Sequence, residues 1–395
     1  MSSLRRSLLA LGSLLLVGCL LVPPLAMGME ESDVTKPRYP PLNTEVMVPE
    51  VMVPDITPAA SIDPLARYRG LPSGPAVDTP SRPIAPAIAM GPAEPIAPPP
   101  VDQLEVSLDW YPSPQHAALY VAKALDMFKH RRLDIRLSTP ADPEVPTKLL
   151  ADSRVDLALT RQPLLHLQVD RGIPLVRVAT LVGVPLTALV VRRDTGIESP
   201  AQLEGARIGH ADQDAEQILL PAMLADHDVS MDSLDTPNVH YRMEQAMHEG
   251  RVDAIIGGMR HLLPRALAND GLATRSFAVE DYGMPRHDGL ILVANRNELK
   301  RQRSAIQRFV SALEEATAWI LEHPDESWRL LAATEPTLDT PVNRDAWPEI
   351  RARLTQTPSA LSHGRYQNVE HFLFEAGLVE NRHPVSRLAV DINTP

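Results

Sequence analysis

The sequence predicts an α/β protein with two lobes, each a mostly parallel sheet flanked by helices. From about Val101 onward, short apolar runs that read as strands alternate with helical periods, which is the pattern of βαβ units. Two such runs, 104–182 and 206–259, are separated by "ALVVRRD", and "LILVANR" follows the second. These two strand-like connectors predict two hinge crossings, with a cleft where the carboxyl ends of the strands face each other.

The first part of lobe 1 is predicted over residues 101–187. It begins with the strand "LEVSLDW", in which apolar and polar residues alternate, and the amphipathic helix "AALYVAKALDMF". The strands "LDIRLST", "VDLALT" and "PLVRVATLV" follow, with the short helix "TKLLADS" after the first of them.

Lobe 2 is predicted over residues 188–290. The strand "ARIGHA" opens onto the helix "AEQILLPAMLADH", and the strands "NVHYRM" and "DAIIGGM" flank a helix over "EQAMHEG". Residues 291–395 are predicted to return to lobe 1 with C-terminal helices, of which "SAIQRFVSALEEATAWILEH" is the longest periodic segment.

Residues 1–19 have the pattern of a lipoprotein-type signal peptide. Two arginines precede an apolar run that ends at Cys19, the single cysteine of the chain. We expect export, with Cys19 lipidated as a membrane anchor; an ordinary signal peptide cleaved near residues 26–28 is the alternative. Pro23 and Pro24 interrupt the apolar run, which argues against a membrane-spanning anchor.

Residues 20–100 are predicted to form a proline-rich, disordered tether. Seventeen of the chain's 39 prolines lie between Pro37 and Pro100, where aromatic residues are few. Such a segment would hold the folded part away from a membrane. Neutral filler and an arm for a proline-binding partner are the alternatives.

The composition argues against several classes of site. The net charge is −12 and the short basic clusters "KHRR" and "KRQR" lack interleaved aromatic residues, so nucleic-acid binding is not expected. Without a cysteine pair or a helical H-x-x-x-H pair, we expect neither metal nor cofactor. A cluster of His210, Asp212, Asp214 and His261 is the alternative metal site.

Two residues near the first helix are candidates for holding a small planar ligand. Trp110 follows directly after a strand and offers a flat face for a heteroaromatic ring, although a tryptophan that caps the sheet is the alternative. His116 stands at the helix start, where backbone N–H groups also point outward, and a plain capping histidine is the alternative.

The charged candidates point in two directions. Glu216, near a helix start beside Asp212 and Asp214, suits the exocyclic amine of an aminopyrimidine, although a carboxylate is favourable at that end of any helix. If both faced the cleft, Arg161 and Arg260 would instead suit a carboxylate, sulfonate or phosphate.

Several segments of the globular part of the chain resemble those of a known family. The matching text includes "LDWYPSPQHAALYVAKALDMFKHRRLDIRL", "LVVRRDTGIESPAQLEGARIGH", "GRVDAIIGGMR", "DGLILVANRNEL" and "SHGRYQNVEHFLFEAGLVE", and extends over about residues 104–391. It is similar to periplasmic solute-binding proteins for hydroxymethylpyrimidine-type thiamine precursors, which resemble fungal pyrimidine synthases. The resemblance implies a type II-like periplasmic-binding-protein fold and delivery of a pyrimidine to an ABC importer.

The resemblance also implies ligand-side roles, residue by residue. The matching positions are Trp110, His116, Gln162, Glu216, Arg260 and Asp288. The departures are Ser113 for an asparagine, Arg161 for a tyrosine, the turn that begins at His210 for a glycine-rich one, His261 for an asparagine and Gly289 for a glutamate. The sequence thus matches the family more closely in the segments that form the fold than at the positions that would contact a ligand.

The same resemblance bears on catalysis. The lysine that carries pyridoxal phosphate in the synthases corresponds to Thr160, and their histidine corresponds to Leu164, so no Schiff base forms here. We therefore expect a monomeric, exported solute-binding protein, not an enzyme, with an ABC permease as partner. The alternatives are the same scaffold retuned to a small organic anion, and a non-transport envelope protein that uses the proline-rich arm.

Overall fold

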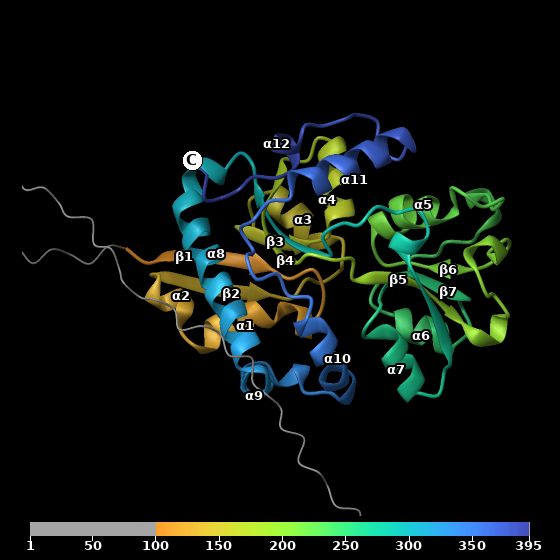
Figure 1. Cartoon of the computed structure of the whole chain (residues 1–395), viewed down its shortest axis with the longest axis horizontal. Helices are drawn as coiled ribbons and strands as arrows, with labels where there is room; N and C mark the ends of the chain where they lie inside the picture. The colour runs from red at the N-terminus through yellow and green to blue at the C-terminus, as the bar shows by residue number, and fades with distance from the viewer. Residues whose placement is uncertain (1–99, 395) are drawn as a thin grey trace, which may run out of the picture. The chain divides into compact units, whose positions relative to one another are not determined.

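The computed structural model describes residues 100–394, and these residues confirm the predicted α/β fold with two sheets (Figure 1). The predicted signal peptide (1–19), the lipidation of Cys19 and all but the last residue of the predicted tether (20–100) lie outside the described residues. No helix of the described part is both long and apolar enough to cross a bilayer.

The larger sheet, sheet A, has five strands in the order β2-β1-β3-β9-β4. Its strands are β1 (Asp102–Ser107), β2 (Leu133–Ser138), β3 (Leu157–Thr160), β4 (Leu175–Val182) and β9 (Leu290–Asn295). Strand β1 is parallel to β2 and β3, whereas β9 lies antiparallel between β3 and β4. The sheet is therefore mixed, because the reversed strand β9 makes two of its four pairings antiparallel, where a mostly parallel sheet was predicted.

The smaller sheet, sheet B, has four strands in the order β6-β7-β5-β8. Its strands are β5 (Thr187–Arg192), β6 (Ile208–Gly209), β7 (Ala254–Met259) and β8 (Thr274–Ala278). Strand β5 is antiparallel to both neighbours, so each connector strand is the reversed strand of its sheet. The predicted boundaries at 187/188 and 290/291 fall at the first residues of β5 and β9; the hinge between two lobes stays a prediction.

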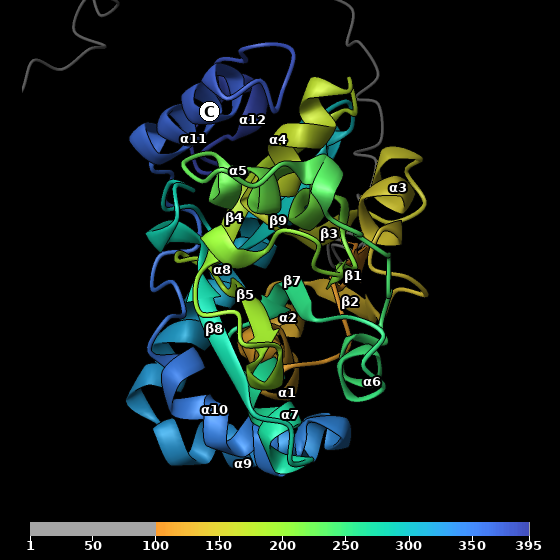
Figure 2. The same ribbon diagram turned by 90° about the vertical axis from the view of Figure 1, so that its right-hand side faces the viewer.

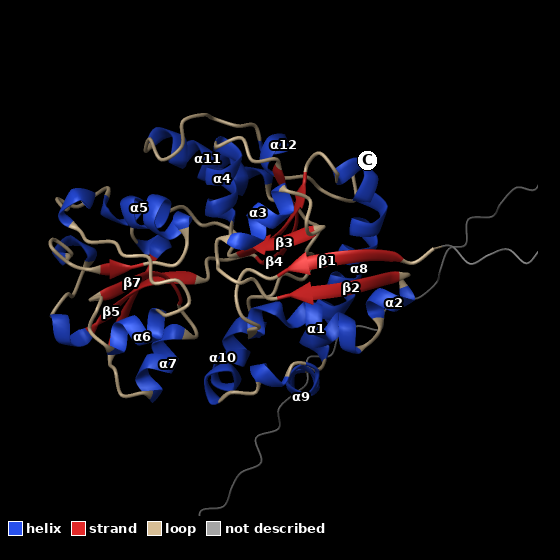
Figure 3. Ribbon diagram, turned by 180° about the vertical axis from the view of Figure 1, so that it is seen from behind, coloured by secondary structure: helices blue, strands red, loops and turns tan. Residues whose placement is uncertain are grey.

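Helices cover both faces of both sheets (Figures 1 and 3). The α-helices are α1 (Ala117–Ala124), α2 (Met127–His130), α3 (Val145–Ala151), α4 (Gln162–Asp170), α5 (Leu220–Leu224), α6 (Met243–His248), α7 (Leu263–Asn269), α8 (Leu299–Glu322), α9 (Pro324–Thr334), α10 (Pro341–Arg351), α11 (His363–Glu375) and α12 (Val385–Leu388). The 3₁₀ turns are η2 (Pro114–His116), η3 (Arg193–Thr195), η4 (Pro200–Gln202), η6 (Met231–Ser233), η7 (Val279–Asp281) and η8 (Pro336–Leu338), and η5 (Ala215–Leu219) is a π-helical turn.

Alternation along the central strands divides the core of sheet A into two layers. Leu157 and Leu159 of β3 face the cluster that contains α1 and α8, whereas Ala158 faces the cluster under α4 and α11. Burial on both faces explains why these strands read as continuous apolar runs. Sheet B is layered in the same way, with α5 on one face and α6 and α7 on the other.

Two local predictions were wrong. The segment "NVHYRM" is not a strand: it makes an isolated bridge between Asn238 and His210 and then turns at His240, whose φ is 49°. The helix predicted over 117–128 is interrupted, because Asp126 adopts a left-handed φ of 53° between α1 and α2. In both places one residue leaves the regular backbone, which apolar periodicity does not register.

Candidate ligand-binding site

A cavity of about 620 Å³ lies between the loops of the two sheets. Sheet A supplies the loop between β1 and η2, the residue after β3 and the start of α10, while sheet B supplies the loop after β6, the end of β7, and helices α6 and α7. Figure 2 looks onto the sheet B side, and in this view α6 and α7 lie below β1 and β2. Arg161 directly follows β3, and Trp110 and Asp212 come three residues after the ends of β1 and β6. Ligands bind near such strand ends in open α/β sheets.

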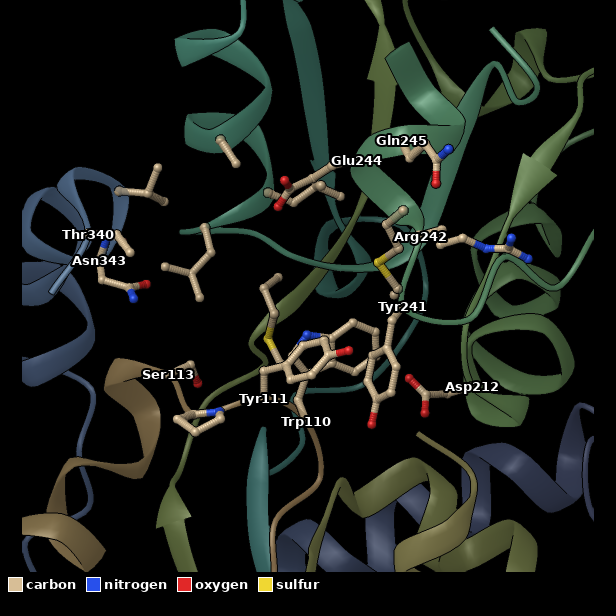
Figure 4. A pocket seen from close by; sticks show the side chains of 18 of the residues that line it. Trp110, Tyr111, Ser113, Asp212, Tyr241, Arg242, Glu244, Gln245, Thr340 and Asn343 are labelled. Carbon is tan, nitrogen blue, oxygen red and sulfur yellow. The ribbon is translucent and has the colours of Figure 1, made fainter. Parts of the chain in front are cut away.

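Three aromatic rings from both sheets form one wall of the cavity (Figure 4). Trp110 and Tyr111 follow β1, and Tyr241 precedes α6. The Tyr241 ring lies 4.6 Å from Trp110, edge to face, and 4.4 Å from Tyr111 at a tilt of 37°. The Tyr241 hydroxyl donates to the carbonyl oxygen of Pro140 at 2.9 Å, which fixes the ring across the cleft. Trp110 is half-buried and packs against the sheet B core, so it is both a packing residue and a cavity residue.

Beside the aromatic wall, a buried ion cluster joins the two sheets. Arg161, which follows β3, donates from Nε and Nη2 to both oxygens of Asp214 at 3.1 and 3.0 Å. The same Nη2 lies 2.6 Å from Asp212. All three side chains are at least 94% buried, and Arg161 and Asp212 line the cavity. One guanidinium thus serves two carboxylates from the loop after β6.

Asp212 has an unusual protonation equilibrium. Burial raises the pKa of Asp212 to about 6, because the attraction of Arg161 is shared with Asp214, whose own charge adds repulsion. At neutral pH a small fraction of Asp212 therefore carries a proton. A carboxyl in this condition can accept from an amine and can also donate to a ring nitrogen.

A second buried pair lies behind the aromatic wall. His116 Nδ1 accepts from the backbone N–H of Ser113 at 3.1 Å, so Nε2 carries the proton that points to Asp109 Oδ1 at 2.8 Å. Burial by itself would raise the pKa of Asp109, but His116 and Arg161 together lower it. This pair fixes the loop that carries Trp110.

The other end of the cavity is apolar. Its side chains come from α6, α7, β7 and α10: Met243, Met259, Leu262, Leu263, Ala266 and Val342. Glu244 and Asn343 are polar residues on this side (Figure 4). The lining thus changes from aromatic and charged at one end to aliphatic at the other.

Of the nine predicted ligand-binding residues, the structure brings Trp110, Ser113 and Arg161 to the cavity wall. His116 lies behind them, bonded to Asp109. Arg260 pairs with Glu280 at 2.7 Å and donates to the carbonyl oxygen of Thr187.

The remaining four predicted residues have partners within the protein and do not line the cavity. Gln162 Oε1 accepts from the backbone N–H of Asp288 at 2.8 Å, and the Asp288 carboxylate accepts from Thr180. The Glu216 carboxylate accepts from the Thr236 hydroxyl at 3.3 Å. His210 Nε2 lies 3.7 Å from the other oxygen of the same carboxylate. A ligand role for these four stays a prediction.

Several cavity residues were missed by the sequence analysis. Tyr111 adjoins Trp110 after the same strand, so the strand-end argument would have found it. Tyr241 and Glu244 lie in a segment interpreted as a strand running into a helix. Asn343 comes from a helix distant along the chain, and no signal in the sequence places it near the others. Among residues 100–394, no group of three metal-ligating side chains has a geometry that would hold an ion.

The sequence match decides the family. The family model described as NMT1/THI5 like matches residues 113–327, more than half of the 395-residue chain. The chain belongs to the NMT1/THI5-like family.

Relatives of this NMT1/THI5-like chain include binding proteins and enzymes. A Haemophilus influenzae protein named for thiamine biosynthesis is 36% identical over 292 residues, which is 74% of this chain and 92% of that relative. A formylaminopyrimidine-binding protein of Halalkalibacterium halodurans is 28% identical over 63% of this chain and 76% of its own length. A Candida albicans relative, 26% identical over 60% of this chain and 72% of its own, is named 4-amino-5-hydroxymethyl-2-methylpyrimidine phosphate synthase.

Solved structures place this NMT1/THI5-like chain in the periplasmic-binding-protein fold. The alkanesulfonate-binding protein SsuA of Xanthomonas axonopodis pv. citri, bound to MOPS, superposes with a TM-score of 0.58 at 19% identity over 74% of this chain and 99% of its own. A Candida albicans gene product with the generic periplasmic binding protein fold has a TM-score of 0.58 at 15% identity, over 73% and 96%. The expected fold and family are confirmed.

Proposed function

We propose that this protein is the solute-binding component of an ABC importer and captures a pyrimidine precursor of thiamine. The observation that carries the proposal is the Asp212 carboxyl beside the aromatic wall of Trp110 and Tyr241 in a cavity between the two sheets. The named formylaminopyrimidine-binding relative supports the same ligand class. The ligand we propose is a hydroxymethyl-, aminomethyl- or formylamino-pyrimidine.

The cavity wall offers two kinds of contact to an aminopyrimidine. Its ring can lie against Trp110 and Tyr241, a contact worth about 0.5–1.5 kcal/mol beyond the buried area. The Asp212 carboxyl can accept from the exocyclic amine, and its protonated fraction can donate to the adjacent ring nitrogen. His116, through Asp109, holds the loop that presents the ring-binding face.

The rival ligand class, a small organic anion, loses its main support. Arg161 already faces two carboxylates, and Arg260 lies outside the cavity lining and pairs with Glu280. An anion near Arg161 would face the excess negative charge of Asp212 and Asp214, which disfavours it.

We propose that the chain binds its pyrimidine without converting it. Thr160 ends β3 and Leu164 lies in α4, so the positions matched to the lysine and histidine of the synthases carry no amine or imidazole. Incubation with hydroxymethylpyrimidine should return the compound unchanged, as judged by mass spectrometry. A new product would overturn this part of the proposal.

The remaining parts of the proposal concern the cell envelope. We propose export to the periplasm, a lipid at Cys19, a tether over residues 20–100, a permease as partner, and a monomer that closes about the two crossings between the sheets. Mass spectrometry of the mature protein tests the lipid, since a diacylglyceryl adduct at Cys19 is expected.

Ligand binding is tested by thermal unfolding of the purified protein with hydroxymethyl-, aminomethyl- and formylamino-pyrimidines and with a panel of alkanesulfonates. A ligand at a hundred times its Kd adds about 2.7 kcal/mol to the free energy of unfolding. We expect stabilisation by a pyrimidine and none by a sulfonate. Stabilisation by sulfonates alone would refute the proposed ligand class.

The matched variants are Trp110→Leu in the cavity and Phe374→Leu on the exposed face of α11. Trp110→Leu should weaken pyrimidine binding about tenfold, by removing the ring-stacking face. Phe374→Leu should leave the affinity unchanged. Equal affinities in the two variants would mean that the aromatic wall does not hold the ligand.

A further inference from the structure

The cavity is larger than one pyrimidine ring requires. Its volume of about 620 Å³ lies within the range of about 300–1,000 Å³ that is typical of drug-sized ligands. A ring held between Trp110 and Asp212 would occupy the aromatic end and leave the aliphatic end unfilled. Burying an apolar group of the ligand against these aliphatic side chains would remove apolar surface from water and so favour binding.

The aliphatic end is built by three helices from both sheets. Leu262, Leu263 and Ala266 come from the start of α7, Met243 begins α6, and Val342 lies in the first turn of α10. Leu263 is anchored in the core of sheet B, because its side chain packs against Gly258 of β7. The surface is therefore a fixed part of the fold.

One carboxylate faces this end of the cavity. Glu244, in the first turn of α6, lines the cavity next to these apolar side chains, and Figure 4 shows it well away from Asp212. Within residues 100–394, its carboxylate makes no hydrogen bond or ion pair.

Glu244 is exposed at the cavity wall, and the charges near it are of both signs. Partial desolvation, followed by repulsion from Asp270, raises the pKa of Glu244, and His248 opposes the shift. The neighbouring Arg242 is exposed, and its guanidinium points away from Glu244 (Figure 4). A ligand cation placed here would be attracted to a cavity-lining carboxylate that has no cationic partner within residues 100–394.

We infer that the cavity takes a two-part cation: an aminopyrimidine ring at the aromatic end, linked to a second, apolar and positively charged group at the aliphatic end. Glu244 is the counter-ion of the second group, which lies against Leu262, Leu263 and Ala266. This inference rests on the proposed function, because the aminopyrimidine half uses the site described above.

Three probes separate the two halves of the ligand. Hydroxymethylpyrimidine carries the ring alone, thiamine adds a thiazolium cation, and the deaza analogue of thiamine has the same shape with a neutral second ring. Titration calorimetry on the purified protein should give a Kd for thiamine at least about tenfold below that of either other probe. Tenfold corresponds to about 1.4 kcal/mol.

Two cavity variants assign the second half to its residues. Glu244→Gln should raise the Kd for thiamine to that of the deaza analogue and leave hydroxymethylpyrimidine unchanged. The control Glu249→Gln, in the exposed turn after α6, should change neither Kd. Ala266→Phe should fill the aliphatic end and reject both two-ring probes, while hydroxymethylpyrimidine still binds.

The outcomes separate this inference from the proposed function. If hydroxymethylpyrimidine binds as tightly as thiamine, or if Glu244→Gln weakens all probes equally, the two-part ligand is refuted and the pyrimidine site stands. If thiamine and its deaza analogue bind equally, Glu244 is not a counter-ion and the inference is wrong. If no probe binds, both proposals fail.

Discussion

At the scale of single residues, Asp212 links the chemistry of the cavity to the stability of the protein. Its carboxyl is buried with Asp214 against one guanidinium, and its pKa is about 6. A carboxyl that is harder to ionise in the folded state than in the unfolded state costs stability when it ionises. The same property lets it offer either an acceptor or a donor to a ligand.

The variant Asp212→Asn tests this linkage. Between pH 4 and pH 6 the folded wild type binds more protons at Asp212 than the unfolded chain does, so its free energy of unfolding should fall as the pH rises through this window. Asp212→Asn should lose this contribution and be about 1–3 kcal/mol more stable than wild type above pH 7. Thermal unfolding at pH 5 and pH 8 measures the difference.

Two outcomes would contradict this prediction. The first is an identical pH dependence in wild type and variant. The second is a large loss of stability at pH 8, which would mean that the ion pair with Arg161 outweighs the desolvation of Asp212. The control Asp235→Asn, outside the cavity lining, should leave the curve unchanged.

The sequence predicted the place of a side chain when that place depends on the preceding strand. It did not predict the partner of a side chain when that partner comes from a distant loop. Trp110 follows a strand, and strand ends meet the cleft, so its place in the cavity wall followed from local pattern. Arg161 was a candidate for holding a ligand anion only if it and Arg260 both faced the cleft. Its carboxylate partners come from a loop of the other sheet, and only the packed structure brings them within 3 Å.

At the scale of elements, β7 shows how closely a strand and a turn meet at the cavity. Gly257 has a φ of 82°, and a Cβ there would lie 2.8 Å from the Cβ of Ala215, the first residue of the π-helical turn η5. Pro221 follows this turn and lacks an N–H for the regular helical bond, which accounts for the wider turn.

Gly257→Ala should therefore destabilise the fold by two separate effects. The left-handed backbone costs about 1–2 kcal/mol for any side chain, and the contact with Ala215 adds to it. Gly271→Ala is the matched control, because its φ is 84° and nothing lies within 4 Å of its Cβ position. Chemical denaturation should give the larger loss for Gly257→Ala, and equal losses would show that the contact is relieved at no cost.

Elements with strong periodicity were predicted well, and irregular ones were not. The apolar runs of β3, β4, β5 and β9 are fully or nearly buried on both faces, and their composition alone marks them as strands. Strand β8 (Thr274–Ala278) lies at the edge of sheet B with mixed burial, and its short polar text gave no signal. The turn at His240 depends on a backbone angle that no pattern of hydrophobicity encodes.

At the scale of the whole molecule, contacts across the cavity link the two sheets. Glu349 of α10 lies 2.5 Å from Arg265 of α7 and 2.7 Å from His261. On the other side, His240 lies 2.7 Å from Asp142. Contacts of this kind exist only while the sheets face each other closely, so they favour the arrangement in which the cavity is covered.

Glu349→Gln should accelerate release of a bound pyrimidine. An exposed ion pair contributes about 0.2–1 kcal/mol, so the dissociation rate should rise by a factor of about 1.4 to 5. Stopped-flow displacement followed by tryptophan fluorescence measures it. The control Glu298→Gln removes a similar exposed ion pair, with Arg301, at the start of α8. Because this pair does not join the two sheets, the rate should stay unchanged. An unchanged rate in Glu349→Gln would mean that α10 and α7 do not hold the cavity shut.

The position of β9 also sets the order in which the molecule can be completed. Strands β3 and β4 each pair with β9 and, among the described strands, not with each other, while the whole of sheet B lies between β4 and β9 along the chain. Sheet B is one continuous segment and can form as soon as that segment is free. In a chain that enters its compartment N-terminus first, the edges of β3 and β4 stay open until β9 arrives, which makes sheet A the slow and aggregation-prone half of folding. The strand that arrives last joins two strands that precede the whole of sheet B along the chain.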